Sequence, residues 1–203
     1  MMRLCFPQSV AMLVVLAGAF AVSPGCASSP DAQSTVHSMG EFGSEVAKVK
    51  DSIDRTLASL DTVVASQPAD IVANVEAYGK SVKSLDGLAK VVKGRAEEMK
   101  SKGDEYFKAW EAPADVTPER RAQLTESYGK IKTDMAAAKE EFTPFLASLK
   151  DIESYLKVDP SVKGIGSMSK LTAKAKESGA TVKSRIDAVM VQVNSVRGMM
   201  QVK

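Results

Sequence analysis

The chain of 203 residues is poor in the side chains that chemistry most often uses, since it holds one histidine, two cysteines and 11 aromatic residues. A single histidine excludes any metal or catalytic site that needs two. The formal net charge of +2 provides no basic field of the kind that binds nucleic acid. The length suits one domain with a sizeable core. We therefore expect no enzyme activity, no cofactor, no metal and no nucleic-acid partner.

Residues 1–25 resemble an export signal. Arg3 precedes an apolar run at residues 10–22, which is shorter than the ~20 residues of a membrane-spanning helix and fits the core of a signal peptide. Gly25-Cys26 then resembles the cleavage box of bacterial lipoproteins, in which the cysteine becomes the new N-terminus and carries the acyl chains. Ser23 departs from that box, which usually has a large aliphatic residue at this place.

Cys26 is the predicted site of lipid attachment. Cys5 leaves with the signal, so the mature chain has one cysteine and no internal disulfide. Ala27 follows the cysteine, where an aspartate would resemble an inner-membrane retention signal, so we expect an outer-membrane anchor in a bacterial cell envelope, facing the periplasm. The alternatives are cleavage after Ala21, which would release the protein, and a free thiol at Cys26.

Residues 26–40 are small and polar and show no apolar periodicity, so they are predicted to form a flexible tether. His37 lies in this segment and is expected to be solvated. The bundle domain is predicted to span residues 41–203.

The body of the chain carries apolar residues at alternating steps of four and three, the helical period. Four stretches have this pattern, at residues 42–63, 71–110, 124–156 and 168–200. No segment alternates as a half-buried strand does. Pro68, Pro118 and Pro160 mark the breaks, and Thr117 reads as the N-cap of the third helix. The pattern predicts an all-α, elongated antiparallel up-down bundle with coiled-coil-like heptad packing.

The register follows from residue size, because large side chains should meet small ones in a core without voids. Folding each helix back on the next at such a register predicts two pairs for the first helix, Leu60–Val75 and Ile53–Val82, and five pairs of a large with a small residue: Gly103–Tyr128, Ala96–Met135, Ala89–Phe142, Phe145–Ala175 and Phe142–Gly179. The N-terminal end of the first helix then lies near Val92 of the second, so we expect three long helices and one half-length N-terminal helix. Pro144 predicts a kink in the third helix, either a hinge or a static bend.

Residues 103–111 (GDEYFKAWE), Arg120-Arg121 and residues 142–146 (FTPFL) are similar to a bacterial family of exported helical proteins that is catalogued only as a domain of unknown function. The resemblance covers most of residues 40–200. It implies an envelope location and a coiled-coil-like body, and it brings no catalytic residue.

Two functions fit these features. The leading hypothesis is a lipid-anchored structural or interaction protein that binds a protein partner or a second copy along the half-covered seam. Its candidate contact residues are Met99, Phe107, Trp110, Tyr128 and Val193. For the aromatic cluster near the second turn we favour the alternative that Tyr106 and Trp110 cap the core and Phe107 packs over the loop. The alternative is a carrier that holds a lipid or other apolar molecule in a cavity left beside small residues, for which the candidates are Ala89, Gly103, Ala175 and Gly179.

Overall fold

The computed structural model of the protein describes residues 32–108 and 117–201. These residues are 93 % helical and none of them lies in a strand, so the predicted all-α bundle is confirmed. The helices are α1 (Ala32–Val64), α2 (Ile71–Lys108), α3 (Pro118–Val158), α4 (Val162–Ser167) and α5 (Ser169–Gln201). The predicted signal segment, Cys26 and Trp110 lie outside the described residues.

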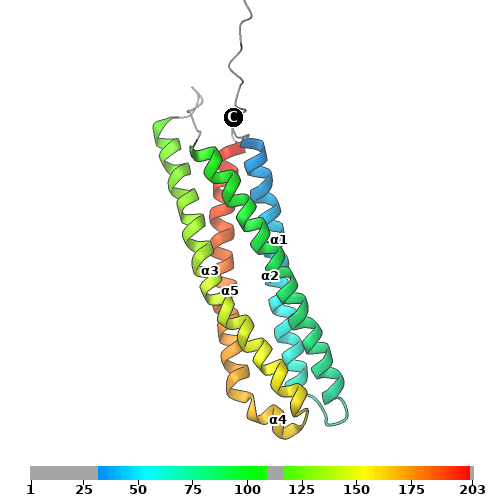
Figure 1. The fold of residues 1–203 in the computed structure, drawn as a ribbon. Helices are drawn as coiled ribbons and strands as arrows, with labels where there is room; N and C mark the ends of the chain where they lie inside the picture. The colour runs from blue at the N-terminus through cyan, green and yellow to red at the C-terminus, as the bar shows by residue number, and fades with distance from the viewer. Residues whose placement is uncertain (1–31, 109–116, 202–203) are drawn as a thin grey trace, which may run out of the picture.

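The four long helices run lengthwise beside one another, up and down in turn, and α4 forms the corner between α3 and α5 (Figure 1). The start of α1 and the end of α5 lie at the same end of the bundle (Figure 1). The most extensive contacts join α1 with α2 and α3 with α5. The bundle is therefore built from two helix pairs that lie face to face.

The helix boundaries follow local sequence signals. The Thr117 side chain accepts a hydrogen bond from the Arg120 amide at 3.3 Å, and Pro118 opens α3, as predicted. Ser161 caps α4 by accepting from the Gly164 amide at 3.1 Å. A Cβ at Gly164 would overlap the carbonyl oxygen of Asp159, so this corner requires a glycine.

The prediction of a tether over residues 26–40 is wrong for residues 32–40, because α1 begins at Ala32. Thr35, Ser38, Met39 and Phe42 all lie on the buried face of α1, at the spacing of one helix face. The Ser38 hydroxyl donates to the Thr35 carbonyl at 2.9 Å. That bond removes the cost of burying a hydroxyl, so small polar residues continue a buried stripe that looks hydrophilic in the sequence.

The predicted half-length first helix is therefore also wrong. Glu41 of α1 forms an ion pair with Arg95 of α2 at 3.1 Å, and Gly40 lies against the Arg197 guanidinium of α5. His37 is exposed on α1, 3.7 Å from the Glu41 carboxylate. Helix α1 therefore lies beside the other three long helices well past the level of Val92, where the sequence had placed its N-terminal end.

The predicted register holds for α1 against α2 and at one end of α2 against α3. The Thr56 hydroxyl lies 3.4 Å from the Ser81 carbonyl, between the levels of the predicted pairs Ile53–Val82 and Leu60–Val75. A Cβ at Gly103 would lie 2.6 Å from the ring of Tyr128, so that predicted pair is confirmed.

One predicted pair between α3 and α5 is wrong. The ring that lies nearest to Gly179 belongs to Phe145 rather than to Phe142, and Leu57 of α1 covers the same glycine. Helical side chains lean toward the N-terminus of their own helix. In an antiparallel pair this lean carries the Phe145 ring from the level of Ala175 to the next turn of α5. Phe142 is half-buried instead.

The third helix continues through Pro144 without a break. Proline removes one backbone hydrogen bond and crowds the preceding turn, and Figure 1 shows α3 changing direction near the middle of its length. Phe142 and Phe145 meet edge to face beside the proline, with ring centroids 6.2 Å apart.

Two glycines of α2 should respond oppositely to substitution by alanine. A Cβ at Gly94 meets nothing within 4 Å, so Gly94→Ala should raise the free energy of unfolding by about 0.5–1 kcal/mol through helix propensity. Gly103→Ala should lower it by about 1–3 kcal/mol because the hydrogen-bonded Tyr128 ring has to move. Urea denaturation measures both, and a gain in stability from Gly103→Ala would contradict the close contact.

Candidate functional site

A cavity of about 380 Å³ lies inside the bundle, where α2 and α3 separate near the middle of their lengths. Each of the four long helices contributes to its wall. The lining residues are Phe42, Val46 and Val49 of α1; Ala89, Val92, Lys93, Ala96, Glu97 and Lys100 of α2; Met135, Ala138, Lys139 and Phe142 of α3; and Val182, Ile186 and Val189 of α5. The interior surface is almost entirely apolar.

Burial shows which side of the cavity is open. The lining residues of α1 and α5 are buried, none of them more than 7 % exposed, and they form the floor. The apolar lining residues of α2 and α3, which are Ala89, Val92, Ala96, Met135, Ala138 and Phe142, are only half-buried. The cavity therefore opens to solvent between α2 and α3.

The opposite side of the bundle is closed by charge pairs. Lys50 of α1 pairs with Asp187 of α5 at 2.6 Å, and two further pairs, Asp54 with Lys183 and Asp61 with Lys176, join the same two helices. Exposed pairs of this kind contribute little stability individually. Their repetition along one seam nevertheless fixes α1 and α5 in register beneath the cavity.

Two tyrosines join α2 to α3 on either side of the opening. The Tyr78 hydroxyl donates to the Leu149 carbonyl at 2.9 Å. The Tyr128 hydroxyl lies 3.0 Å from two acceptors on α2, the Lys100 carbonyl and the Asp104 carboxylate. Between these levels the facing residues of α2 include Ala89 and Ala96, which are too short to close the gap. The helices are held together at both levels and remain apart in the middle.

Burial keeps both phenols protonated. It raises the pKa of Tyr78 well above the ordinary value, and the Glu153 carboxylate adds to the effect. Burial likewise raises the pKa of Tyr128, together with its hydrogen bond to Asp104. Both hydroxyls therefore remain neutral donors throughout the physiological range of pH.

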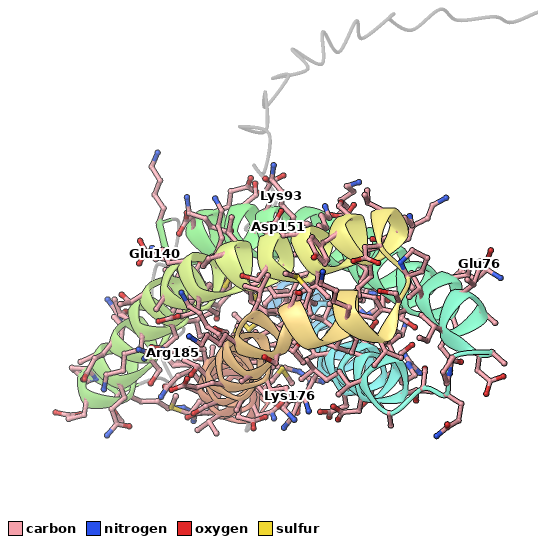
Figure 2. All side chains as sticks on the ribbon, turned by 90° about the horizontal axis from the view of Figure 1, so that it is seen from below. Glu76, Lys93, Glu140, Asp151, Lys176 and Arg185 are labelled. Atoms are coloured by element: carbon pink, nitrogen blue, oxygen red, sulfur yellow. The ribbon has the colours of Figure 1, made fainter. Side chains whose placement is uncertain are left out.

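Charged side chains surround the mouth of the cavity. Lys93, Glu97 and Lys100 of α2 and Lys139 of α3 are exposed residues of its lining. Lys93 lies 3.9 Å from the Glu97 carboxylate. Figure 2 shows Lys93 on the α2–α3 side of the bundle, opposite Lys176 on the α5 side.

Three of the residues predicted to bind a protein partner are inside the molecule. Met99 and Val193 are 0 % exposed and Tyr128 is 3 % exposed, so no partner reaches them in this fold. The seam that would have exposed them is covered because α1 extends to Ala32. Phe107 is half-buried and stacks on Tyr128 with ring centroids 4.6 Å apart, which fits the alternative of a cap on the core.

The four small residues predicted to leave a cavity lie in different surroundings in the structure. Tyr128 fills the space at Gly103, and Leu57 and Phe145 fill the space at Gly179. Ala175 is fully buried. Of these candidates only Ala89 lines the cavity. Ala96 also lines the cavity, but the sequence prediction paired it with Met135 and so did not recognise it as part of a site.

No family model, no curated protein and no solved structure matches the chain. The resemblance to the exported helical family therefore stays a prediction. None of the helices in the described part of the chain combines the length and the apolar character needed to cross a membrane. Residues 32–108 and 117–201 also contain no cluster of three His, Cys, Asp or Glu side chains suited to a metal ion.

The raised tyrosine pKa values predict a loss of stability in alkali. The unfolded phenols ionise near pH 10 whereas the folded ones stay protonated, so the free energy of the unfolded state falls as the pH rises above about 10, and the free energy of unfolding decreases. The variant Tyr78→Phe should lose about 1 kcal/mol at pH 7 with its hydrogen bond. Its stability should then fall less steeply than that of the wild type between pH 10 and 11.5 in urea denaturation, and equal slopes would contradict the assignment.

Proposed function

We propose that the bundle binds an apolar molecule in the cavity between α2 and α3 and acts as a non-enzymatic carrier or receptor for it. The observation that supports this function is the cavity itself, which has an apolar floor, an opening to solvent and a volume of about 380 Å³. Ligand sites in proteins are concave, largely apolar and of ~300–1,000 Å³. Phe142 and Met135 of its wall are only half-buried, and an apolar ligand would cover them.

The energetics allow useful affinity. A methylene group is about as large as a water molecule, whose share of liquid volume is ~30 Å³, so the cavity holds roughly a dozen methylenes. Their transfer from water contributes ~0.8 kcal/mol each, or ~10 kcal/mol together. Association costs at least ~4 kcal/mol. The remainder corresponds to a dissociation constant of about 10–100 µM, before any polar contact is counted.

The same proposal places the carrier in a bacterial cell envelope. Its support is the sequence alone: the apolar run at residues 10–22 and the Gly25-Cys26 box are typical of an exported lipoprotein. Two acyl chains on Cys26 would anchor the protein stably. An interaction role along the seam, the other hypothesis, needs Met99, Tyr128 and Val193 to be accessible, and their burial favours the carrier.

Filling the cavity should abolish binding. The probe is N-phenyl-1-naphthylamine, an uncharged fluorophore whose emission rises in apolar surroundings, and we expect saturable binding to the wild type. Ala96→Phe places a ring in the cavity, so it should weaken binding at least tenfold and leave the protein folded or more stable, by up to about 2 kcal/mol.

The matched control is Ala77→Phe, an exposed position of the same helix, which should bind as the wild type does. Ala138→Phe tests the same space from α3. Absence of saturable binding to the wild type, or unchanged binding by both cavity variants, would contradict the proposed function.

The N-terminus of the mature protein tests the envelope location. After expression in a Gram-negative host, mass spectrometry should find a chain that begins at Cys26 with acyl groups attached, in the membrane fraction. Cys26→Ser should leave the protein without acyl groups. A mature chain that begins at Val22 would instead identify a released protein and contradict the lipid anchor.

A further inference from the structure

The mouth of the cavity has more positive than negative charge. Three lysines, Lys93, Lys100 and Lys139, and a single carboxylate, Glu97, belong to the lining. Everything else in the lining is apolar, so these four side chains supply all of its formal charge. The local excess contrasts with the whole chain, in which 27 basic residues are nearly balanced by 25 acidic ones.

Two of the three lysines at the mouth, Lys100 and Lys139, differ in their ion pairing from the lysines beside the opening. On one side of the opening Lys150 of α3 pairs with Asp86 at 2.7 Å, and on the other Lys132 pairs with Asp104 at 3.1 Å. Within residues 32–108 and 117–201, Lys100 and Lys139 form no ion pair. The cations in the middle therefore keep unused capacity for an anion.

The antiparallel register brings Lys93 of α2 and Lys139 of α3 to similar levels. The contact of Gly103 with Tyr128 sets Lys93 of α2 opposite Ala138 of α3, and Lys139 is the next residue. Lys100 lies two turns beyond Lys93 on the same face of α2. Long lysine stems cover apolar surface and keep the ammonium in water, so all three can meet a charged group at the opening without desolvation of their own.

The floor cannot accept a charge. Its residues on α1 and α5 are Phe42, Val46, Val49, Val182, Ile186 and Val189, and none of them has a polar side-chain atom. Burying an unpaired charge among them would cost several kcal/mol. Any charged part of a ligand must therefore stay at the mouth, while its apolar part fills the cavity.

We infer that the ligand is a single-chain amphiphile with an anionic head, such as a free fatty acid of about a dozen carbons, whose chain lies in the cavity while its head meets Lys93, Lys100 and Lys139. This inference rests on the proposed function and adds the chemistry of the head. The lining spans residues 89–100 of α2, roughly 16 Å of helix, so the space is elongated along the bundle as an extended chain requires. A cavity of about 380 Å³ that extends over roughly 16 Å is too narrow for a partner helix about 10–12 Å across, and a second acyl chain would double the volume needed.

The test uses three ligands with the same twelve-carbon chain, each below its micelle concentration, in competition with N-phenyl-1-naphthylamine: dodecanoate, dodecanol and dodecyltrimethylammonium. The double variant Lys100→Gln/Lys139→Gln should weaken dodecanoate binding about five- to tenfold, which corresponds to a few tenths to 1 kcal/mol per exposed charge pair. Its affinity for dodecanol and for the uncharged fluorophore should change less than about twofold. Binding of dodecyltrimethylammonium should strengthen or stay the same.

The control is Lys80→Gln/Lys83→Gln, which removes the same charge from exposed positions of α2 outside the cavity and should leave dodecanoate binding unchanged. Vesicles of a diacyl phosphatidylglycerol form a further arm and should compete poorly. If the fluorophore binds but both lysine variants affect dodecanoate equally, or if the vesicles compete better than dodecanoate, this inference is overturned and the proposed function stands. If the fluorophore does not bind at all, the proposed function itself fails.

Discussion

The distance between α2 and α3 is set by the contact of Tyr128 with Gly103, on which the rest of the bundle's geometry depends. The ring occupies the place of a glycine side chain, and its hydroxyl reaches the Lys100 carbonyl and the Asp104 carboxylate. Tyr78 makes the corresponding link to Leu149 nearer the other end. Between these two contacts, the size of the facing side chains decides whether the space between α2 and α3 is filled. The alanines there, such as Ala89 and Ala96, are too small to fill it. A hollow core is thus the result of two tight contacts rather than of loose packing.

The asymmetry between the two sides of the bundle has an electrostatic counterpart. On the α1–α5 side lysines and aspartates pair across the seam and neutralise each other, as Lys50 does with Asp187. On the α2–α3 side the pairs between the helices stop where the cavity opens, and Lys100 and Lys139, which form no ion pair in the described part of the chain, take their place. Since screening by salt weakens such exposed interactions, the affinity for a charged ligand should depend on ionic strength far more than the stability of the fold does.

The fold could be predicted because the apolar period of the helices is strong and their ends carry clear signals, such as Thr117 before Pro118. Matching large residues to small ones recovered the pair Gly103–Tyr128. The start of α1 could not be predicted in this way, because Thr35 and Ser38 are polar yet buried. The Ser38 hydroxyl is satisfied by the Thr35 carbonyl, a bond that hydropathy does not register. Of the positions proposed for a cavity only Ala89 lines it, and the rest of the wall was missed for a different reason. Pairing by level ignores the lean of helical side chains, which takes the Phe145 ring to Gly179 and leaves Phe142 beside an open space.

The early start of α1 has a consequence for the geometry of anchoring. If Cys26 carries acyl chains, only residues 27–31 separate the bilayer from the first turn of the helix, and five residues reach at most about 18 Å. Phe42, the first lining residue of α1, is ten residues further along, or about 15 Å of helix. The opening would then stand within roughly one bilayer thickness of the headgroups. A single-chain molecule that leaves the membrane would need to cross only a thin layer of water to enter it.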